Sequence, residues 1–252
     1  MNRKISEIIA TQALVLAVLF SLMQPVQAQQ AAQAQQAATP YPHMAPAAEY
    51  FMSDPNAEIA LARSAAPPAI AGKATILVLK EHGYETAVQG SNGFVCVVER
   101  SWMSAFSAPE FWNPKMRGPV CLNPPAVRSV LPFTYKRTEM VLAGLSKTQM
   151  IAGLKQAIAK KEIPALEPGA MSYMLSRESN LGDSVGHWHP HLMFYRPESD
   201  GAEWGANLPG SPVLFDPQFR GEPEALNTFL VPVLKWSDGT VASLDAHSES
   251  HR

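Results

Sequence analysis

Three histidines that alternate along the chain, His187, His189 and His191, have the spacing that best fits a metal site. Alternate side chains of an extended strand share a face, and neutral imidazole is a good ligand for zinc or copper. Neighbouring rings start about 7 Å apart and the outer pair about 13 Å apart, so only two of them can reach one ion. A complete site therefore needs another ligand. The candidates are His82, Glu178, Asp183 and Glu198.

The alternative interpretation is a strand with three solvent-facing histidines and no metal. Trp188, Leu192 and Phe194 would lie on the opposite face, which is apolar enough to explain the strand by burial alone. Pro190 has no backbone N–H, which places the strand at a sheet edge or a bulge. The sequence leaves both interpretations open, and the cofactor is either none or a divalent metal such as zinc.

Other chemistry has weaker support. The chain lacks the Gly-x-Ser-x-Gly, Ser-x-x-Lys and His-Glu-x-x-His motifs and a glycine-rich phosphate loop. Glu178 and Asp183 could act as acid and base, or form a polar loop. The aromatic and methionine side chains between residues 102 and 112 could line a ligand pocket, or pack in the core. They are Trp102, Met103, Phe106, Phe111 and Trp112.

The two cysteines of the chain, Cys96 and Cys121, are expected to form a disulfide. This expectation follows from the N-terminal segment, which indicates export to an oxidising compartment. A catalytic thiol is the alternative, but a reactive cysteine needs an electropositive setting, and the neighbours of Cys96 are apolar.

Residues 1–28 have the three zones of a signal peptide: basic Arg3 and Lys4, an apolar run over 13–22, and a small-residue cleavage site that ends at Ala28. The run is shorter than the roughly 20 apolar residues that cross a membrane. We therefore expect a periplasmic or secreted protein that has no membrane association after signal cleavage.

The formal net charge of −2 over 252 residues argues against a nucleic-acid partner, because such proteins need a basic surface. Residues 29–48 are rich in Gln, Ala and Pro and are expected to form a disordered linker. Residues 49–241 form the predicted single globular domain, and residues 242–252 a flexible tail.

Hydrophobic patterning predicts strands over 74–80, 84–89, 94–100, 170–175, 187–195, 213–215 and 229–234. Asn92-Gly93 predicts a hairpin between the second and third of these, and residues 101–132 are expected to form an ordered loop. A short helix is expected after Asp54, and a clearer one after Ser146, where Gln149 completes a capping box. The predicted fold class is α+β, with a mainly antiparallel sheet, two or three short helices and one disulfide.

The chain also resembles a set of uncharacterised exported bacterial proteins. The stretches that carry the resemblance are residues 64–68, 90–96, 119–121, 173–175 and 190–193. It implies a shared fold and export but no activity, and it implies that more distant members have a counterpart of His191 without His187 and His189.

Two functional hypotheses follow. The first is a module that binds a small molecule or a protein partner in a pocket without paired titratable groups. The second is a metal-dependent enzyme, such as a hydrolase, in which His187, His189 or His191 holds an ion that activates water. The sequence does not decide whether the protein is an enzyme.

Overall fold

The computed structural model describes residues 40–183, 185–198, 201–215, 222–224 and 226–242. The chain divides into a unit Met1–Pro42, of which only residues 40–42 are described, and a compact unit His43–Arg252. The predicted signal peptide, residues 29–39 of the predicted linker and residues 243–252 of the predicted tail lie outside the described residues. Among the described residues, none of the helices has both the length and the apolar character needed to cross a membrane.

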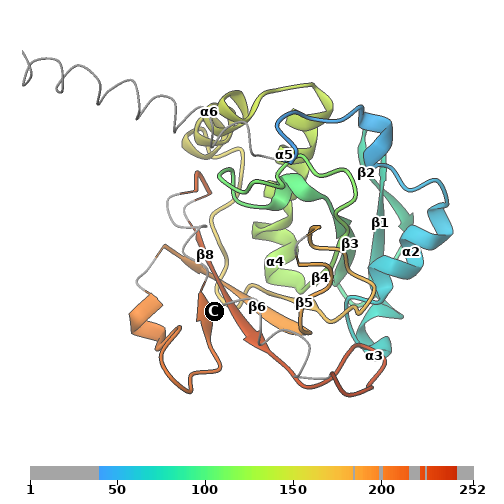
Figure 1. Ribbon diagram of the computed structural model, residues 1–252, viewed down its shortest axis with the longest axis vertical. Coiled ribbons are helices and arrows are strands. Elements are labelled where there is room, and N and C mark those ends of the chain that lie inside the picture. Colours follow the sequence, from blue (N-terminus) through green and yellow to red (C-terminus); the bar gives the residue numbers. More distant parts are fainter. Residues whose placement is uncertain (1–39, 184, 199–200, 216–221, 225, 243–252) are drawn as a thin grey trace, which may run out of the picture. The chain divides into compact units, whose positions relative to one another are not determined.

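The described part of the compact unit contains one sheet and five α-helices (Figure 1). The strands are β1 (Thr75–Lys80), β2 (Gly83–Val88), β3 (Val95–Glu99), β4 (Gly118–Leu122), β5 (Met171–Met174), β6 (His191–Pro197), β7 (Leu214–Phe215) and β8 (Leu226–Pro232). The α-helices are α2 (Pro55–Arg63), α3 (Pro68–Ala71), α4 (Pro124–Ser129), α5 (Leu131–Leu142) and α6 (Lys147–Ala159), and the 3₁₀ turns are η1 (Ala47–Tyr50), η2 (Ser101–Met103) and η3 (Gly201–Trp204).

The eight described strands form a single sheet in the order β2-β1-β3-β4-β5-β6-β8-β7. Of the pairs between named strands, only β1 with β3 is parallel. This arrangement confirms the predicted α+β class with a mainly antiparallel sheet. The helices outnumber the two or three that were expected.

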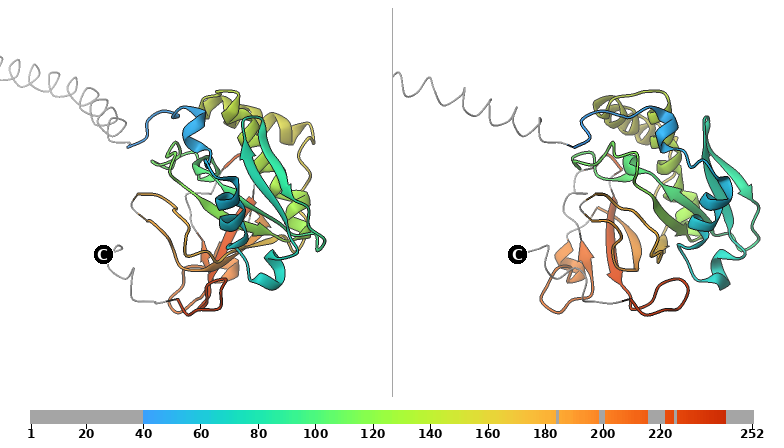
Figure 2. Two further views of the ribbon diagram at one scale, coloured as in Figure 1. Left: turned by 90° about the vertical axis from the view of Figure 1, so that its right-hand side faces the viewer. Right: turned by 45° about the vertical axis from the view of Figure 1, so that its right-hand side comes forward.

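Helices cover both faces of the strands β1, β3 and β4 (Figure 2). Cys96 and Val98 of β3 pack in one core cluster with residues of α2 and α3. Val95 and Val97 pack on the opposite face with residues of α4 and the start of α5. Because side chains alternate along a strand, the next inward position on the α5 face is Glu99.

The predicted hairpin at Asn92-Gly93 is wrong, because β2 and β3 lie on opposite edges of β1 and do not pair. The hairpin turn lies earlier, at the Lys80 to Gly83 end of the β1–β2 pair. Residues 90–93 instead cross the start of β1, where the N–H of Ser91 donates to the Lys73 carbonyl over 2.8 Å. A Cβ at Gly90 would lie 2.2 Å from the backbone nitrogen of Thr75, so only glycine permits this close crossing.

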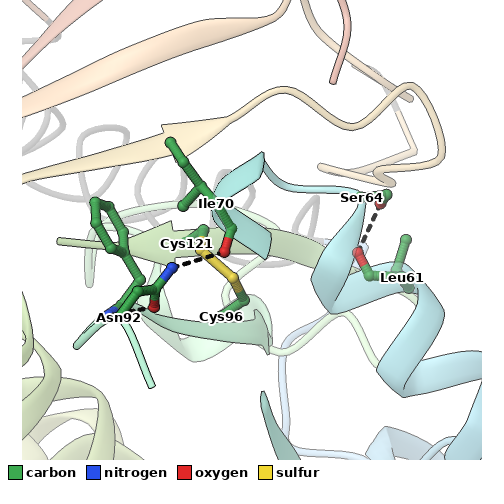
Figure 3. The surroundings of a disulfide bond; sticks show 7 residues. Leu61, Ser64, Ile70, Asn92, Cys96 and Cys121 are labelled. Atoms are coloured by element: carbon green, nitrogen blue, oxygen red, sulfur yellow. Dashed lines mark hydrogen bonds between the residues drawn. A yellow bond between two sulfur atoms is a disulfide. The ribbon is translucent and has the colours of Figure 1, made fainter. Parts of the chain in front are cut away.

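The predicted disulfide between Cys96 and Cys121 is confirmed (Figure 3). The two residues face each other in the register of β3 and β4, and both are fully buried. Beside the bond, the Asn92 amide donates to the Ile70 carbonyl over 2.8 Å, which ties the crossing segment to α3 (Figure 3).

A buried ion pair joins α2 to the end of β3. Arg100 donates to Glu58 over 2.8 Å, and both side chains are at most 1% exposed. Arg100 also donates to the Tyr50 carbonyl over 2.8 Å, and the amide of Ala45 donates to the Tyr50 hydroxyl over 3.2 Å. The end of the predicted linker is therefore held against the domain through Tyr50.

The Ser146 capping box is confirmed: the N–H of Ser146 donates to the Gln149 side chain over 2.9 Å, and the Ser146 hydroxyl accepts from the N–H of Gln149. The predicted helix after Asp54 is confirmed as α2. The loop expected over 101–132 is wrong in part, because this stretch contains β4 and α4. Helix α5, which follows, was not predicted, and it forms one wall of the site described next.

Candidate functional site

A cavity of about 290 Å³ lies on the α5 face of the sheet, over β6 and β8. Residues 191, 193 and 195 of β6 and residues 226, 228 and 230 of β8 line it, as expected for alternating positions on one face. The apolar part of the wall consists of Met103, Val130, Phe133, Leu181, Trp188, Met193, Leu226 and Leu230. The polar part consists of Glu99, Arg137, His191, Tyr195, Glu222, Glu224 and Thr228.

His191 is buried in the cavity wall with 3% of its surface exposed. Its Nδ1 lies 2.7 Å from the His189 carbonyl oxygen, and because that oxygen can only accept, Nδ1 carries the proton. The ring of Trp188 meets the His191 ring edge-on at 4.7 Å. Burial lowers the pKa of His191 to about 4, so the ring is neutral near pH 7.

The second ring nitrogen of His191, Nε2, therefore carries a lone pair. Among the described residues nothing donates to it, yet it is not one of the fully enclosed unpaired atoms. An atom that has no partner and is not enclosed is accessible, and His191 lines the cavity. Nε2 thus offers a hydrogen-bond acceptor to whatever occupies the cavity.

Glu99 is surrounded by protein but keeps some accessible surface, which we place at the cavity because Glu99 lines it. The Thr134 hydroxyl donates to Oε1 over 3.0 Å, the one hydrogen bond that the described residues make to this carboxyl. Burial raises the pKa of Glu99 to about 7, although Thr134 and the charge of Arg137 oppose the shift. Glu99 is therefore a group that gains or loses a proton near neutral pH.

Arg137 of α5 connects the cavity wall to two acidic residues that precede β8. It donates to Oε1 of Glu224 over 2.5 Å and to Oε2 of Glu222 over 3.4 Å. It also donates to the carbonyls of Trp102 and Ser104 over 2.8 and 2.7 Å. The guanidinium is thus fixed in place by partners from two segments, residues 102–104 and residues 222–224, and it holds the segment before β8 against α5.

The cavity does not match the pocket without paired titratable groups that a simple binding module was expected to have, because Arg137 pairs with Glu222 and Glu224. Burial raises the pKa of Glu222, and Arg137 opposes that shift. Further along β6, the Tyr195 hydroxyl lies 2.9 Å from the Ser172 hydroxyl, and burial raises the pKa of Tyr195. The site therefore combines apolar walls with several acidic groups whose neutral forms burial favours.

The structure separates His187 from His191. Strand β6 begins only at His191, so residues 187–190 are not extended in the sheet and their alternation is lost. His187 is exposed and lies beside Trp236 with a ring separation of 5.9 Å, whereas His191 is buried. Trp188 was expected on the opposite face from His191 and instead lines the same cavity, which corrects that expectation.

No group of three or more His, Cys, Asp or Glu side chains among the described residues is placed to hold a metal ion. The proposed extra ligands His82, Glu178, Asp183 and Glu198 are all exposed, and none lines the cavity. Because Glu178 and Asp183 are exposed and do not line the cavity, they are not an acid and base pair of this site. The metal-dependent enzyme stays an untested alternative that the described geometry does not support.

The aromatic cluster between residues 102 and 112 packs mainly in the core. Its rings contact one another, with Phe106 stacked on Phe111 at 5.1 Å and Phe111 edge-on to Trp112 at 4.7 Å. Only Met103 of this group lines the cavity. The cluster supports the site indirectly, because the carbonyl of Trp102 is one of the acceptors that fix Arg137.

Sequence reasoning found His191 but missed the acidic part of the site. Glu99 had a usable sequence signal, because it ends an otherwise apolar strand and lies on the same face as Val95 and Val97. Arg137 had none, because its acidic partners lie more than 80 residues away in the sequence.

Comparison of the chain with protein-family models, with curated proteins and with solved structures gives no match. The resemblance to exported bacterial proteins therefore stays a prediction, and the site must be interpreted from its own chemistry.

Proposed function

We propose that the protein is an exported binding module that holds one small, largely apolar molecule in the cavity beside His191. The observation that carries this proposal is an apolar cavity of about 290 Å³ with a buried, neutral imidazole whose Nε2 accepts no hydrogen bond from the described residues. Small-molecule sites are typically about 300–1,000 Å³ and combine apolar walls with a few placed polar groups. This cavity fits the lower end of that range.

The energetics favour an amphipathic occupant. A buried polar atom without a partner costs about 1–3 kcal/mol, so water or a ligand must donate to Nε2 of His191. A ligand that donates to Nε2 and also covers the apolar wall gains twice, because it satisfies the acceptor and removes apolar surface from water. Water can donate to Nε2 but cannot cover the apolar wall.

Methionine methyl NMR tests the proposal, because Met103 and Met193 line the cavity whereas Met52 and Met150 do not. Titration with 1-hexanol and benzyl alcohol should give saturable shifts at Met103 and Met193 and none at the two controls. Both alcohols carry one donor on an apolar body of suitable size.

A matched pair of variants completes the test. Thr228→Phe places a ring in the cavity and should abolish the shifts, whereas Thr86→Phe makes the same change at an exposed position of β2 and should preserve them. Thermal unfolding of both variants checks that they are folded. Absence of saturable shifts in the parent protein, or equal shifts in both variants, would overturn the proposal.

A further inference from the structure

The charged side chains that line the cavity are unbalanced. Three are acidic, Glu99, Glu222 and Glu224, and one is basic, Arg137. Lys147 interacts favourably with Glu222, but it does not line the cavity, and its ammonium is held by the Phe106 carbonyl at 3.0 Å. The wall itself therefore carries more negative than positive charge when its carboxyl groups are ionised.

Arg137 cannot correct this imbalance by turning toward the cavity. A guanidinium has five N–H groups, and four hydrogen bonds already hold this one, two to backbone carbonyls and two to carboxylates. One cation is thus shared between Glu222 and Glu224, and its four hydrogen bonds hold it in place.

The unsatisfied atoms of the site all point to the same chemistry. Oε2 of Glu224 is fully enclosed without a partner among the described residues, on a side chain that is 8% exposed. Nε2 of His191 is an accessible acceptor, and the carboxyl of Glu99 accepts only from Thr134 among the described residues. Nε2 of His191 and the ionised carboxylate of Glu99 both accept hydrogen bonds, so an occupant that contacts them must bring donors.

We infer that the ligand is an organic cation, a primary or secondary amine on an apolar body, whose ammonium lies near Glu99 and His191. This inference rests on the proposed binding function and names the class of molecule bound. An ammonium supplies several N–H donors and the positive charge that the wall lacks. The enclosed charge of Glu224 adds attraction without contact, because charges act over longer distances in a medium of low dielectric constant.

A matched series of hexylamine, 1-hexanol and hexanoate tests the inference by the methionine NMR titration at about pH 8, where most amines are charged and Glu99 is largely ionised. Hexylamine should bind about tenfold more tightly than 1-hexanol, and hexanoate should bind most weakly. If 1-hexanol shifts Met103 and Met193 but hexylamine binds no more tightly, the cation inference fails and the binding function stands. If none of the three shifts them, both fail.

Two variants locate the cation. Glu99→Gln keeps an oxygen that can accept from Thr134, and Glu224→Gln removes the enclosed charge. Each should reduce the preference for hexylamine over 1-hexanol severalfold. Glu139→Gln, which removes an exposed carboxylate on α5, is the control and should leave the preference unchanged. A preference that survives both site variants would overturn the inference, and using two of them keeps the test valid if one fails to fold.

Discussion

Glu99 and His191 line the same cavity, and burial shifts their pKa values in opposite directions, to about 7 and about 4. Burial favours the neutral form of each, which is protonated for the glutamate and deprotonated for the histidine. Between pH 4.5 and about 7 the native state keeps the Glu99 proton that the unfolded chain has lost, so this group makes stability fall as the pH rises. Between about pH 4 and 6.5 the unfolded chain binds a proton at His191 that the native state excludes, so this group makes stability rise.

The two effects are similar in size and nearly cancel. One pKa unit corresponds to about 1.4 kcal/mol, so each group alone changes the free energy of unfolding by about 3 kcal/mol across its window. Because the windows overlap between pH 4.5 and 6.5, the pair contributes little net pH dependence there. Removing either group should reveal the dependence of the other.

Urea unfolding followed by tryptophan fluorescence between about pH 4 and pH 8 measures this directly. Glu99→Gln removes the contribution to stability that falls as the pH rises. The free energy of unfolding of this variant minus that of the parent should therefore rise by about 3 kcal/mol as the pH increases. His191→Asn keeps an N–H that can donate to the His189 carbonyl, and its relative stability should fall by about the same amount. Glu85→Gln, at an exposed position of β2, is the control for loss of a carboxylate. The reasoning would be refuted if the variant-minus-parent free energies of unfolding changed with pH in the same direction for both site variants. It would also be refuted if they changed no more than that of the control.

Three further predictions concern the rest of the chain. Replacing Cys96 and Cys121 together with alanine should lower the free energy of unfolding by about 3 kcal/mol, because the bond closes a loop with a sequence separation of 25; a loss below about 1 kcal/mol in urea unfolding would contradict this. Ser146→Ala should cost about 1 kcal/mol through loss of the cap on α6, and an unchanged urea midpoint would be the contrary result. Mass spectrometry of protein isolated from its host should find Gln29 as the first residue, and an intact Met1 would show that the signal peptide is not cleaved.

The parts of the fold that sequence reasoning predicted correctly depend on local interactions. The Ser146 cap lies three residues from Gln149, and each strand has its own apolar pattern. The predicted hairpin at Asn92-Gly93 was wrong although its local turn signal was good. Strand β1 pairs with β2 on one side and with β3 on the other, so β2 and β3 are not neighbours. Strand pairing is a choice among distant partners, and a turn signal does not decide it.

The candidate site was harder to predict, because distant segments build it. The sequence pattern correctly included His191 among the candidate site residues. Its grouping with His187 and His189 was wrong, because it required a strand that begins four residues before the start of β6. Helix α5 carries Pro132 in its first turn and several β-branched and aromatic residues, so local helix propensity gave little signal for it. Its stability comes from packing against the sheet, which a linear pattern does not show.

The position of the cavity follows from the dimensions of the layers. Eight strands spaced about 4.8 Å apart span about 34 Å, whereas two helices, each about 10 Å wide, cover about 20 Å. On this face α4 packs against β4 and β5, α5 packs against β2, and both share a core cluster with β3. Helix α6 packs against α5. The strands β6 and β8 therefore extend beyond the helical layer, and their inward side chains are covered by loops, including the segment that Arg137 holds through Glu222 and Glu224. Loops pack less regularly than helices, so space remains where the helical layer ends, and Glu99 and His191 are buried at its border.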